Sequence, residues 1–300
     1  MIQENVYDSA VAYPGLAYKT KQFVALTKPR LTSVVVFSGA IGYFMALQSS
    51  FEWGPFLAFL LGSYFITGAA NTMNQVIEKD LDKLMRRTLS RPLPTGNLNV
   101  SESIIFALAM TLAGAILIGT FVNMLAAGLC LLSLVLYSFI YTPLKQISPI
   151  SVLVGAFPGA FPPLIGYAAV ANGIPGEAII LFSIQFIWQF PHFWSIAWVG
   201  HEDYQKAGFK MLPTKAGKSF NTSFQIMLYT LFLVPMGLIP WYFGMSGWVS
   251  AVVAVACGAF FLWKTIVLMR TGTDKAALKI MFASFIYLPV VQLAFLIDKI

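Results

Sequence analysis

Nine apolar stretches, each long enough to cross a lipid bilayer, constrain this chain more than any other feature. A transmembrane helix needs about 20 mostly apolar residues, and such stretches occupy residues 31–49, 55–77, 101–120, 122–141, 151–171, 178–198, 223–243, 247–268 and 280–297. The chain is 58% apolar and 10% charged, whereas a soluble domain is about a quarter charged. The sequence therefore predicts an all-α, polytopic membrane bundle of nine helices, with residues 1–26 as a cytosolic tail and 27–300 as one transmembrane domain.

The positive charges gather on one side of these stretches. When the N-terminus is placed inside, all of the 19 Lys and Arg residues except Lys299 lie in the tail, at inner helix ends or in inner loops, as the positive-inside rule expects. The N-terminus and the two long polar loops, 78–100 and 199–222, are thus predicted to be cytoplasmic. This distribution explains the net charge of +7 without a nucleic-acid partner. The start of the chain contains Glu4 and Asp8 and resembles neither a signal nor a transit peptide, so we expect a bacterial plasma (inner) membrane protein.

Short sequence matches suggest an internal duplication. Ile41–Tyr43 recurs as Ile165–Tyr167, and Glu78 recurs as Glu202 at the same offset. Both long loops then run through basic residues into a Leu-Pro-Thr sequence. A duplication predicts two four-helix pseudo-repeats followed by a ninth helix, with substrate bound at the interface between the repeats. The alternative is chance similarity in an apolar, glycine-rich chain.

The first long loop begins with polar residues that have the spacing of one helix face. Asn74, Glu78 and Asp82 follow one another at intervals of four residues, so on a helix their oxygen atoms lie along one side. The negative end of the helix dipole disfavours such a cluster unless a cation binds there. Mg²⁺ prefers oxygen ligands and leaves positions open for phosphate. The alternative is a solvated acidic helix end that neighbouring basic residues neutralise.

A second acidic cluster opens the other long loop on the same predicted side. Together the two clusters hold five of the 12 acidic residues of the chain: Glu78, Asp80, Asp82, Glu202 and Asp203. Two facing acidic clusters, each followed by basic residues, suit a diphosphate that metal ions bridge. The basic side chains that would bind the departing diphosphate are Arg86, Arg87, Arg91, Lys145 and Lys206.

A diphosphate at a membrane surface favours a lipid-like substrate. The tail of an isoprenoid diphosphate would lie among the apolar helices while its head reaches the polar face. The aromatic content of 15% fits, because aromatic faces stabilise a passing allylic cation, although aromatic residues are also ordinary in membrane helices.

Several sequence blocks, in order across about residues 27–217, strengthen this interpretation. They are Thr27-Lys28-Pro29-Arg30, the motif Asn74–Asp82 with Arg86-Arg87-Thr88 and Arg91–Gly96 after it, Tyr141–Lys145, Gly159–Gly166, Pro191-His192-Phe193-Trp194, and Asp203–Gly208 followed by Met211-Leu212-Pro213. In these blocks the chain resembles the UbiA superfamily of intramembrane prenyltransferases, and within it the branch that uses heme as the acceptor.

The resemblance implies a bundle of nine spans around a central cavity that opens to the membrane. The residues to which it assigns Mg²⁺ binding and catalysis are Asn74, Glu78 and Asp82, with Asp203 and Glu202 for a second ion. It adds Arg30 and Tyr141 to the residues that bind the diphosphate.

This chain departs from the family pattern at two positions. Glu78 stands where the family usually has Asp, which keeps the carboxylate on a longer stem. Ala207 stands where many relatives have an acid, which removes a ligand from the second metal site.

The activity implied is farnesyl transfer from farnesyl diphosphate to a vinyl group of heme B (protoheme IX), with water addition, to give heme O and diphosphate. Such chemistry depends on charge stabilisation and control of water rather than on a protein nucleophile. His192, one of two histidines, is a candidate axial heme ligand; the alternative is a hydrogen-bonded core histidine. The partners implied are membrane lipid and a heme A synthase.

Two other functions are compatible with parts of the sequence. A relative that prenylates a quinone precursor or a chlorin would share the metal site, although the blocks around His192 and after Asp203 favour heme. A transporter would suit nine helices and a repeat, but charged residues are nearly absent inside the predicted spans. The Gly-Ala-Arg-containing motif of the CDP-alcohol phosphotransferases is absent from the sequence.

Overall fold

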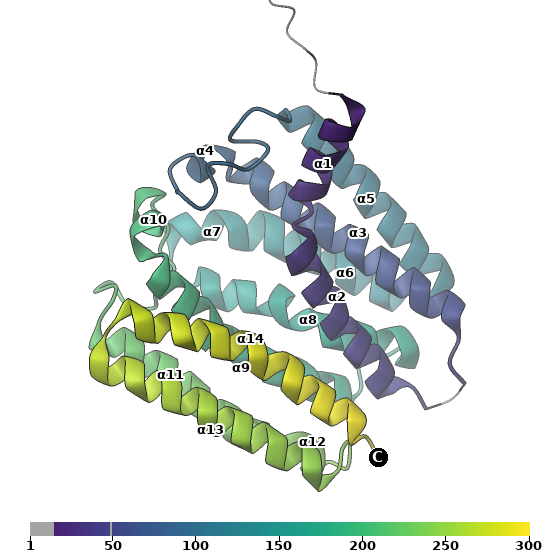
Figure 1. Cartoon of the computed structure of the whole chain (residues 1–300). Coiled ribbons are helices and arrows are strands. Elements are labelled where there is room, and N and C mark those ends of the chain that lie inside the picture. Colours follow the sequence, from purple (N-terminus) through teal and green to yellow (C-terminus); the bar gives the residue numbers. More distant parts are fainter. Residues whose placement is uncertain (1–14, 49) are drawn as a thin grey trace, which may run out of the picture.

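The computed structural model describes residues 15–48 and 50–300, which form helices joined by loops (Figure 1). Within these residues, β-type pairing is limited to an isolated bridge between Ser246 and Lys299. The helices are α1 (Leu16–Leu26), α2 (Pro29–Ala46), α3 (Trp53–Ile77), α4 (Lys79–Asp82), α5 (Val100–Phe121), α6 (Met124–Val135), the π-helix η1 (Leu136–Tyr141), α7 (Thr142–Ile147), α8 (Ser151–Ala171), α9 (Gly176–Val199), α10 (His201–Lys206), α11 (Phe220–Met236), α12 (Ile239–Tyr242), α13 (Trp248–Thr271) and α14 (Asp274–Ile297).

The predicted spans coincide with these helices. Over the described part of the chain, eight helical segments are long and apolar enough to cross a membrane, and the pair α1 and α2, bent by 49°, supplies a ninth if it is counted as one span. The all-α membrane bundle is therefore confirmed. The loops that contain α4 and α10 lie at one end of the bundle, and α12 and the C-terminus lie at the other (Figure 1). The two acidic loops thus share one end, as the charge pattern predicts.

Two helix ends differ from the sequence prediction. α14 begins at Asp274 rather than near residue 280, because the Thr273 hydroxyl caps its polar first turn by accepting a hydrogen bond from the Ala276 N–H at 3.3 Å. The fourth span, predicted to end at residue 141, continues to Ile147 through α7. Hydropathy alone missed both extensions because the added turns are less apolar than the spans they prolong.

Part of the predicted tail is helical and packed. Residues 16–26 form α1, whose last residue, Leu26, is fully buried. The Gln75 amide of α3 donates a hydrogen bond to the Leu26 carbonyl at 2.7 Å. The rest of the tail, residues 1–14, lies outside the described residues, and the division of the chain at residue 26 stays a prediction.

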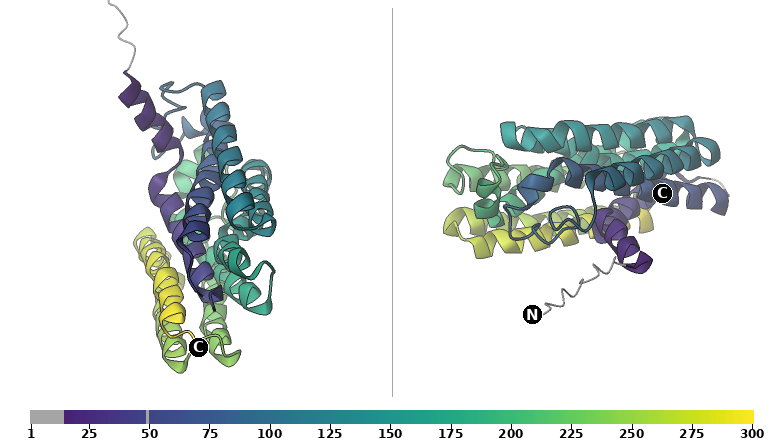
Figure 2. Two further views of the ribbon diagram at one scale, coloured as in Figure 1. Left: turned by 90° about the vertical axis from the view of Figure 1, so that its right-hand side faces the viewer. Right: turned by 90° about the horizontal axis from the view of Figure 1, so that it is seen from above.

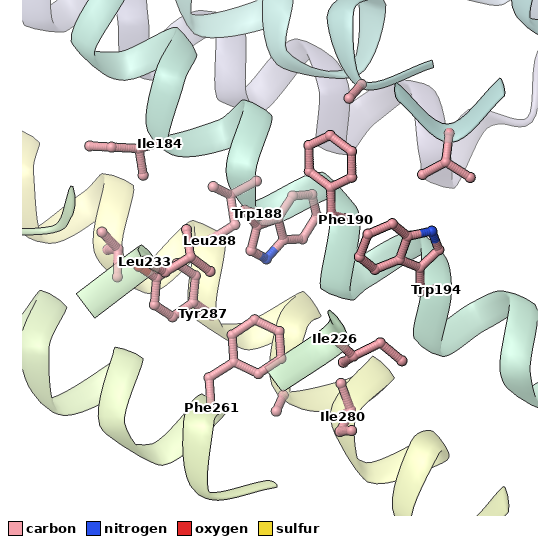
Figure 3. Packing of buried hydrophobic residues seen from close by; sticks show 14 of the residues in the cluster. Ile184, Trp188, Phe190, Trp194, Ile226, Leu233, Phe261, Ile280, Tyr287 and Leu288 are labelled. Atoms are coloured by element: carbon pink, nitrogen blue, oxygen red, sulfur yellow. The ribbon is translucent and has the colours of Figure 1, made fainter. Parts of the chain in front are cut away.

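Two clusters of apolar side chains flank the centre of the bundle. α13 and α14 lie on one side and α5 and α6 on the opposite side (Figure 2). Figure 3 shows one cluster, in which side chains of α9 pack toward α11, α13 and α14; its labelled members include Trp188, Phe190, Trp194, Ile226, Leu233, Phe261 and Tyr287. The other cluster joins α2, α3, α5, α6 and α8. Close-packed apolar clusters are rigid, so they hold the central helices in fixed positions.

α2 and α8 join these two clusters by direct backbone contact at glycines. A methyl group at Gly42 would lie 2.0 Å from the Pro163 carbonyl oxygen, and one at Gly166 would lie 1.8 Å from the Gly39 carbonyl oxygen. Small residues allow membrane helices to approach this closely. Gly42 and Gly166 are also the central residues of the two Ile-Gly-Tyr matches. The repeated sequence therefore lies where the first helices of the two predicted repeats touch.

We expect Gly166→Ala to destabilise the fold by about 1–3 kcal/mol, because the added methyl group overlaps backbone atoms of α2. Gly128→Ala in α6 is the matched control, since no atom lies within 4 Å of a methyl group there. Thermal unfolding of the purified protein in detergent, followed by circular dichroism, measures both variants. An unchanged midpoint for Gly166→Ala would contradict the close crossing.

Candidate functional site

A cavity of about 440 Å³ lies between the two apolar clusters. Its charged lining residues come from helix ends and the first long loop, at the α4 end of the bundle, while apolar residues of α2, α3, α8 and α14 line the remainder. Val34 of α2 and Phe285 of α14 line the cavity and are also about half exposed on the outer surface. The cavity therefore combines a charged mouth with an apolar interior, which suits an amphipathic ligand. The mouth is the charged end, formed by Lys28, Glu78, Asp82, Arg87, Arg91 and Lys145.

The first predicted motif forms one wall of this mouth. Asn74 lies in the last turn of α3, and the backbone hydrogen bonds from Glu78 N–H to the Asn74 carbonyl (3.0 Å) and from Asp82 N–H to the Glu78 carbonyl (2.8 Å) continue the helical repeat into α4. All three side chains are buried and line the cavity. Arg91 binds both carboxylate oxygens of Asp82, at 2.9 and 2.7 Å.

Lys145 of α7 also lines the mouth and forms an ion pair with Glu78. Its ammonium group is 5.0 Å from the ring centres of both Tyr141 and Phe209. Tyr141 is the last residue of η1, and the hydroxyl of Thr142, the first residue of α7, donates to the Tyr137 carbonyl at 2.8 Å. Tyr137 and Tyr141, one helical turn apart, both line the cavity. π-Helical segments occur often at functional sites.

Sequence reasoning did not select Lys28, which nevertheless lines the mouth. It occupies the break between α1 and α2 with a left-handed backbone (φ 49°). Its ammonium group donates a hydrogen bond to Asn74 Oδ1 at 3.1 Å, and the Asn74 amide donates to Thr142 Oγ1 at 3.1 Å. The block Thr27-Lys28-Pro29-Arg30, one of those that resemble the family, was the available signal in the sequence. It pointed equally to Arg30, which is exposed and does not line the cavity.

The second acidic cluster lies differently from the first. Asp203 pairs with Lys206 at 3.3 Å, and neither residue, nor the exposed Glu202, lines the cavity. Their neighbours Tyr204 and Phe209 line it instead. Across residues 15–48 and 50–300, no group of three or more His, Cys, Asp or Glu side chains is arranged to hold a metal ion. The structure therefore brings together the first motif but not the two acidic clusters.

Of the remaining residues predicted to bind the diphosphate, some line the cavity and one does not. Arg87, Arg91, Tyr141 and Lys145 line the cavity, whereas the exposed Arg86 does not. Asp80, on α4 between the motif residues, is solvated: its side chain is 73% exposed and a hydrogen bond from Lys83 at 2.9 Å lowers its pKa.

The charge balance of the mouth is positive. Among the described residues that line it are four cationic side chains (Lys28, Arg87, Arg91, Lys145) and two carboxylates (Glu78, Asp82), a net charge of +2. An anionic ligand is therefore favoured there.

His192 lies on the cavity wall in α9, stacked on Trp188 with ring centres 4.3 Å apart. Its Nδ1 is 2.8 Å from the Ser284 hydroxyl oxygen, and that hydroxyl donates its hydrogen to the Met281 carbonyl at 2.6 Å. Ser284 therefore accepts from Nδ1–H, which leaves the lone pair on Nε2. A neutral imidazole in this tautomer is competent to bind a metal ion.

A cluster of polar residues that the sequence analysis did not identify lines the cavity away from its charged mouth. The Gln185 and Gln189 amides both donate to the Gly159 carbonyl, at 2.7 and 2.8 Å, and Gln185 also accepts from Ser38 at 2.8 Å. All four residues line the cavity. Polar residues at this depth are costly in a membrane and are usually functional. The four residues come from three helices, α2, α8 and α9, so no local sequence pattern brings them together.

These features define a class of protein, a polytopic membrane protein whose two helical halves enclose a cavity with an anion-attracting mouth. The sequence profile of the UbiA prenyltransferase family matches residues 35–288, and the chain belongs to that family. It is a membrane prenyltransferase, and the resemblance of its sequence blocks to this family is confirmed.

Curated relatives resemble it over nearly their whole length. A protoheme IX farnesyltransferase of Cytophaga hutchinsonii is 51% identical, over 95% of this chain and 100% of the relative. Another, of Flavobacterium johnsoniae, is 40% identical over 92% of this chain and 94% of the relative.

Solved structures share the fold at lower identity. A digeranylgeranylglyceryl phosphate synthase superposes with a TM-score of 0.77 at 20% identity, covering 93% of this chain and 98% of the other. A UbiA homologue from Archaeoglobus fulgidus, solved with GPP and Mg²⁺, has a TM-score of 0.69 at 14% identity, covering 91% and 99%.

Proposed function

We propose that this protein transfers the farnesyl group of farnesyl diphosphate to a vinyl group of heme B, with addition of water, to give heme O and diphosphate. The observation that carries the proposal is that one cavity holds both a cationic mouth next to Asn74, Glu78 and Asp82 and a histidine with an available nitrogen lone pair. Relatives that carry the name protoheme IX farnesyltransferase support the choice of acceptor.

The first motif has the donor set that Mg²⁺ requires. An amide oxygen and two carboxylates on one wall are hard oxygen ligands, so Asn74, Glu78 and Asp82 fit the ion as its ligands. When bound, the ion neutralises charge that builds up on the departing diphosphate. The Archaeoglobus relative, described with GPP and Mg²⁺, supports this assignment.

The basic side chains of the mouth then bind the diphosphate oxygens. Arg91 and Lys145 are paired with Asp82 and Glu78, and both exchange part of that pairing for the incoming anion. Fixed cations beside the leaving group stabilise the transition state because they do not need to reorganise. Tyr141 and Tyr137, with ring centres 5.5 Å apart, border the mouth and offer aromatic faces to the allylic cation.

The acceptor is held deeper, next to α9. His192 Nε2 binds the heme iron, and Ser284 fixes the imidazole ring in the tautomer that this requires, as hydrogen-bond partners of metal-binding histidines generally do. The apolar cavity wall excludes bulk water until the vinyl group has reacted.

The membrane setting follows from the distribution of Lys and Arg. We place the N-terminus and both long loops on the cytoplasmic side of a bacterial plasma (inner) membrane. The product, a farnesylated heme, leaves into lipid or to an enzyme that oxidises it further, which is the heme A synthase that the family resemblance implies.

Purified protein incubated with heme B, farnesyl diphosphate and Mg²⁺, followed by mass spectrometry of the porphyrin, tests the proposal. The expected product is heme B plus one farnesyl group and one water. A product formed only from a quinone precursor or a chlorin would favour the other branch of the family, and the absence of any product would favour transport.

A further inference from the structure

We infer that the mouth holds the diphosphate with a single divalent ion, and that Lys28, together with Arg87, supplies the positive charge that a second ion would supply. The inference rests on the proposed function, since it concerns how the same substrate is bound. It replaces the sequence-based expectation that Glu202 and Asp203 hold a second ion.

The orientation of α10 is the first observation. Tyr204 lines the cavity, whereas Asp203, the preceding residue, does not, because neighbouring residues on a helix point about 100° apart. Its carboxylate is 3.3 Å from the Lys206 ammonium group on the same helix. One turn further on, Ala207 is 2% exposed and carries no ligand atom. α10 thus offers the mouth a phenol and no carboxylate.

The loop after α10 is tied down in this orientation. The Lys210 N–H donates to the Lys145 carbonyl at 2.7 Å, and the Gln146 amide donates to the Ala207 carbonyl at 3.2 Å. Phe209 covers the Lys145 ammonium group from the same loop. Bringing Asp203 into the mouth would require breaking these contacts with α7 and displacing Tyr204.

Lys28 lines the same mouth, where its ammonium group is 3.1 Å from Asn74 Oδ1. A left-handed backbone is uncommon for a residue with a side chain, and Lys28 holds it at φ 49°. Strained backbone at a functional site marks a side chain whose position matters. Here the break between α1 and α2 directs a partly buried ammonium group to the first metal motif.

The charge balance also favours one ion. The described lining residues of the mouth carry a net charge of +2. A diphosphate ester carries about three negative charges near neutral pH, so one divalent ion leaves the filled mouth close to neutral. A second ion would add two further positive charges in a partly buried site, where uncompensated charge is costly. In this mouth Lys28 and Arg87 already supply the positive charge that a second ion would bring.

Counting bound Mn²⁺ tests the inference without turnover. Purified protein is titrated with Mn²⁺ in the presence of saturating farnesyl thiolodiphosphate, an analogue whose C–S bond resists ionisation, and free Mn²⁺ is measured by electron paramagnetic resonance. We expect one analogue-dependent Mn²⁺ per chain. Two ions per chain would overturn the inference and leave prenyl transfer intact, whereas failure of the wild-type protein to bind the analogue would overturn the proposed function itself.

Two variants separate the roles of α10 and Lys28. Asp203→Asn should leave the Mn²⁺ count and its affinity within about twofold, while Lys28→Gln should weaken analogue binding on the order of tenfold with the count unchanged, as loss of a charge-assisted hydrogen bond implies. Lys28→Arg should restore most of the binding, and Lys21→Gln, an exposed lysine on α1, is the matched control. A lower Mn²⁺ count in Asp203→Asn, or unchanged binding in Lys28→Gln, would each refute the corresponding half of the inference.

Discussion

Asp82→Asn should lower the rate of farnesyl transfer by at least about 10²-fold, the usual cost of removing a charge that stabilises a transition state. Asp82 is fully buried in the mouth, and its carboxylate is the last of the three oxygen donors along the α3–α4 face. Asp80→Asn is the matched control, because Asp80 lies on the same short helix but its side chain is 73% exposed and paired only with Lys83. That variant should stay within about twofold of wild type.

A loss of stability has to be separated from a loss of chemistry. Removing the Asp82 charge leaves Arg91, whose side chain is 18% exposed, without its bidentate partner, and breaking a buried pair costs about 3–5 kcal/mol. The double variant Asp82→Asn/Arg91→Gln removes both charges and should recover part of the thermal midpoint. It should not recover transfer. If it did, Asp82 would serve only to neutralise Arg91, and the metal assignment would be wrong.

The membrane architecture was predictable because each span is long and uniformly apolar. The thickness of a bilayer sets about 20 residues per helix, and the placement of Lys and Arg on one side supported the count of helices that hydropathy had given. Interruptions within spans were harder to foresee. The π-helical turn η1 lies within the apolar stretch 122–141, where hydropathy does not distinguish a π-helical turn from an α-helical one.

The common placement of Asn74, Glu78 and Asp82 on one cavity wall was predictable for a related reason, since these residues repeat every four positions on one continuous helical path. α10 shows the limit of this reasoning. A helix of six residues is too short for its hydrophobic period to define which side faces inward. The sequence-based prediction placed Asp203 at the metal site and gave Tyr204 no role, whereas in the structure Tyr204 lines the cavity and the loop that follows α10 packs against α7.

Lys28 and Ser284 escaped prediction because their partners are distant in sequence. Lys28 meets Asn74 across 46 positions, and Ser284 meets His192 across 92. A single sequence carries no signal for such pairs. What the sequence did contain was the chemical type of each residue: a lysine beside a helix-breaking proline, and one histidine inside an apolar span.

His192→Ala should weaken heme binding by more than about 10-fold, because loss of a ligand should cost at least as much as loss of a ligand's hydrogen-bond partner, which usually costs about 10–100-fold. It should also shift the Soret band, because the iron loses its nitrogen ligand. Binding of farnesyl diphosphate should be unchanged, since His192 lies away from the charged mouth on α9. Added imidazole should restore part of the spectrum by filling the space that the side chain leaves.

Two further substitutions make this result specific. Ser284→Ala removes the acceptor that fixes Nδ1–H and should give a smaller loss of heme affinity without a change of iron ligand, because Nε2 remains. His201→Ala changes the other histidine of the chain, which does not line the cavity, and should leave the heme spectrum unaltered. An unchanged Soret band and heme affinity in His192→Ala would mean that the iron finds its ligand elsewhere. His192 would then be a core histidine, held by Ser284 and Trp188 for packing alone.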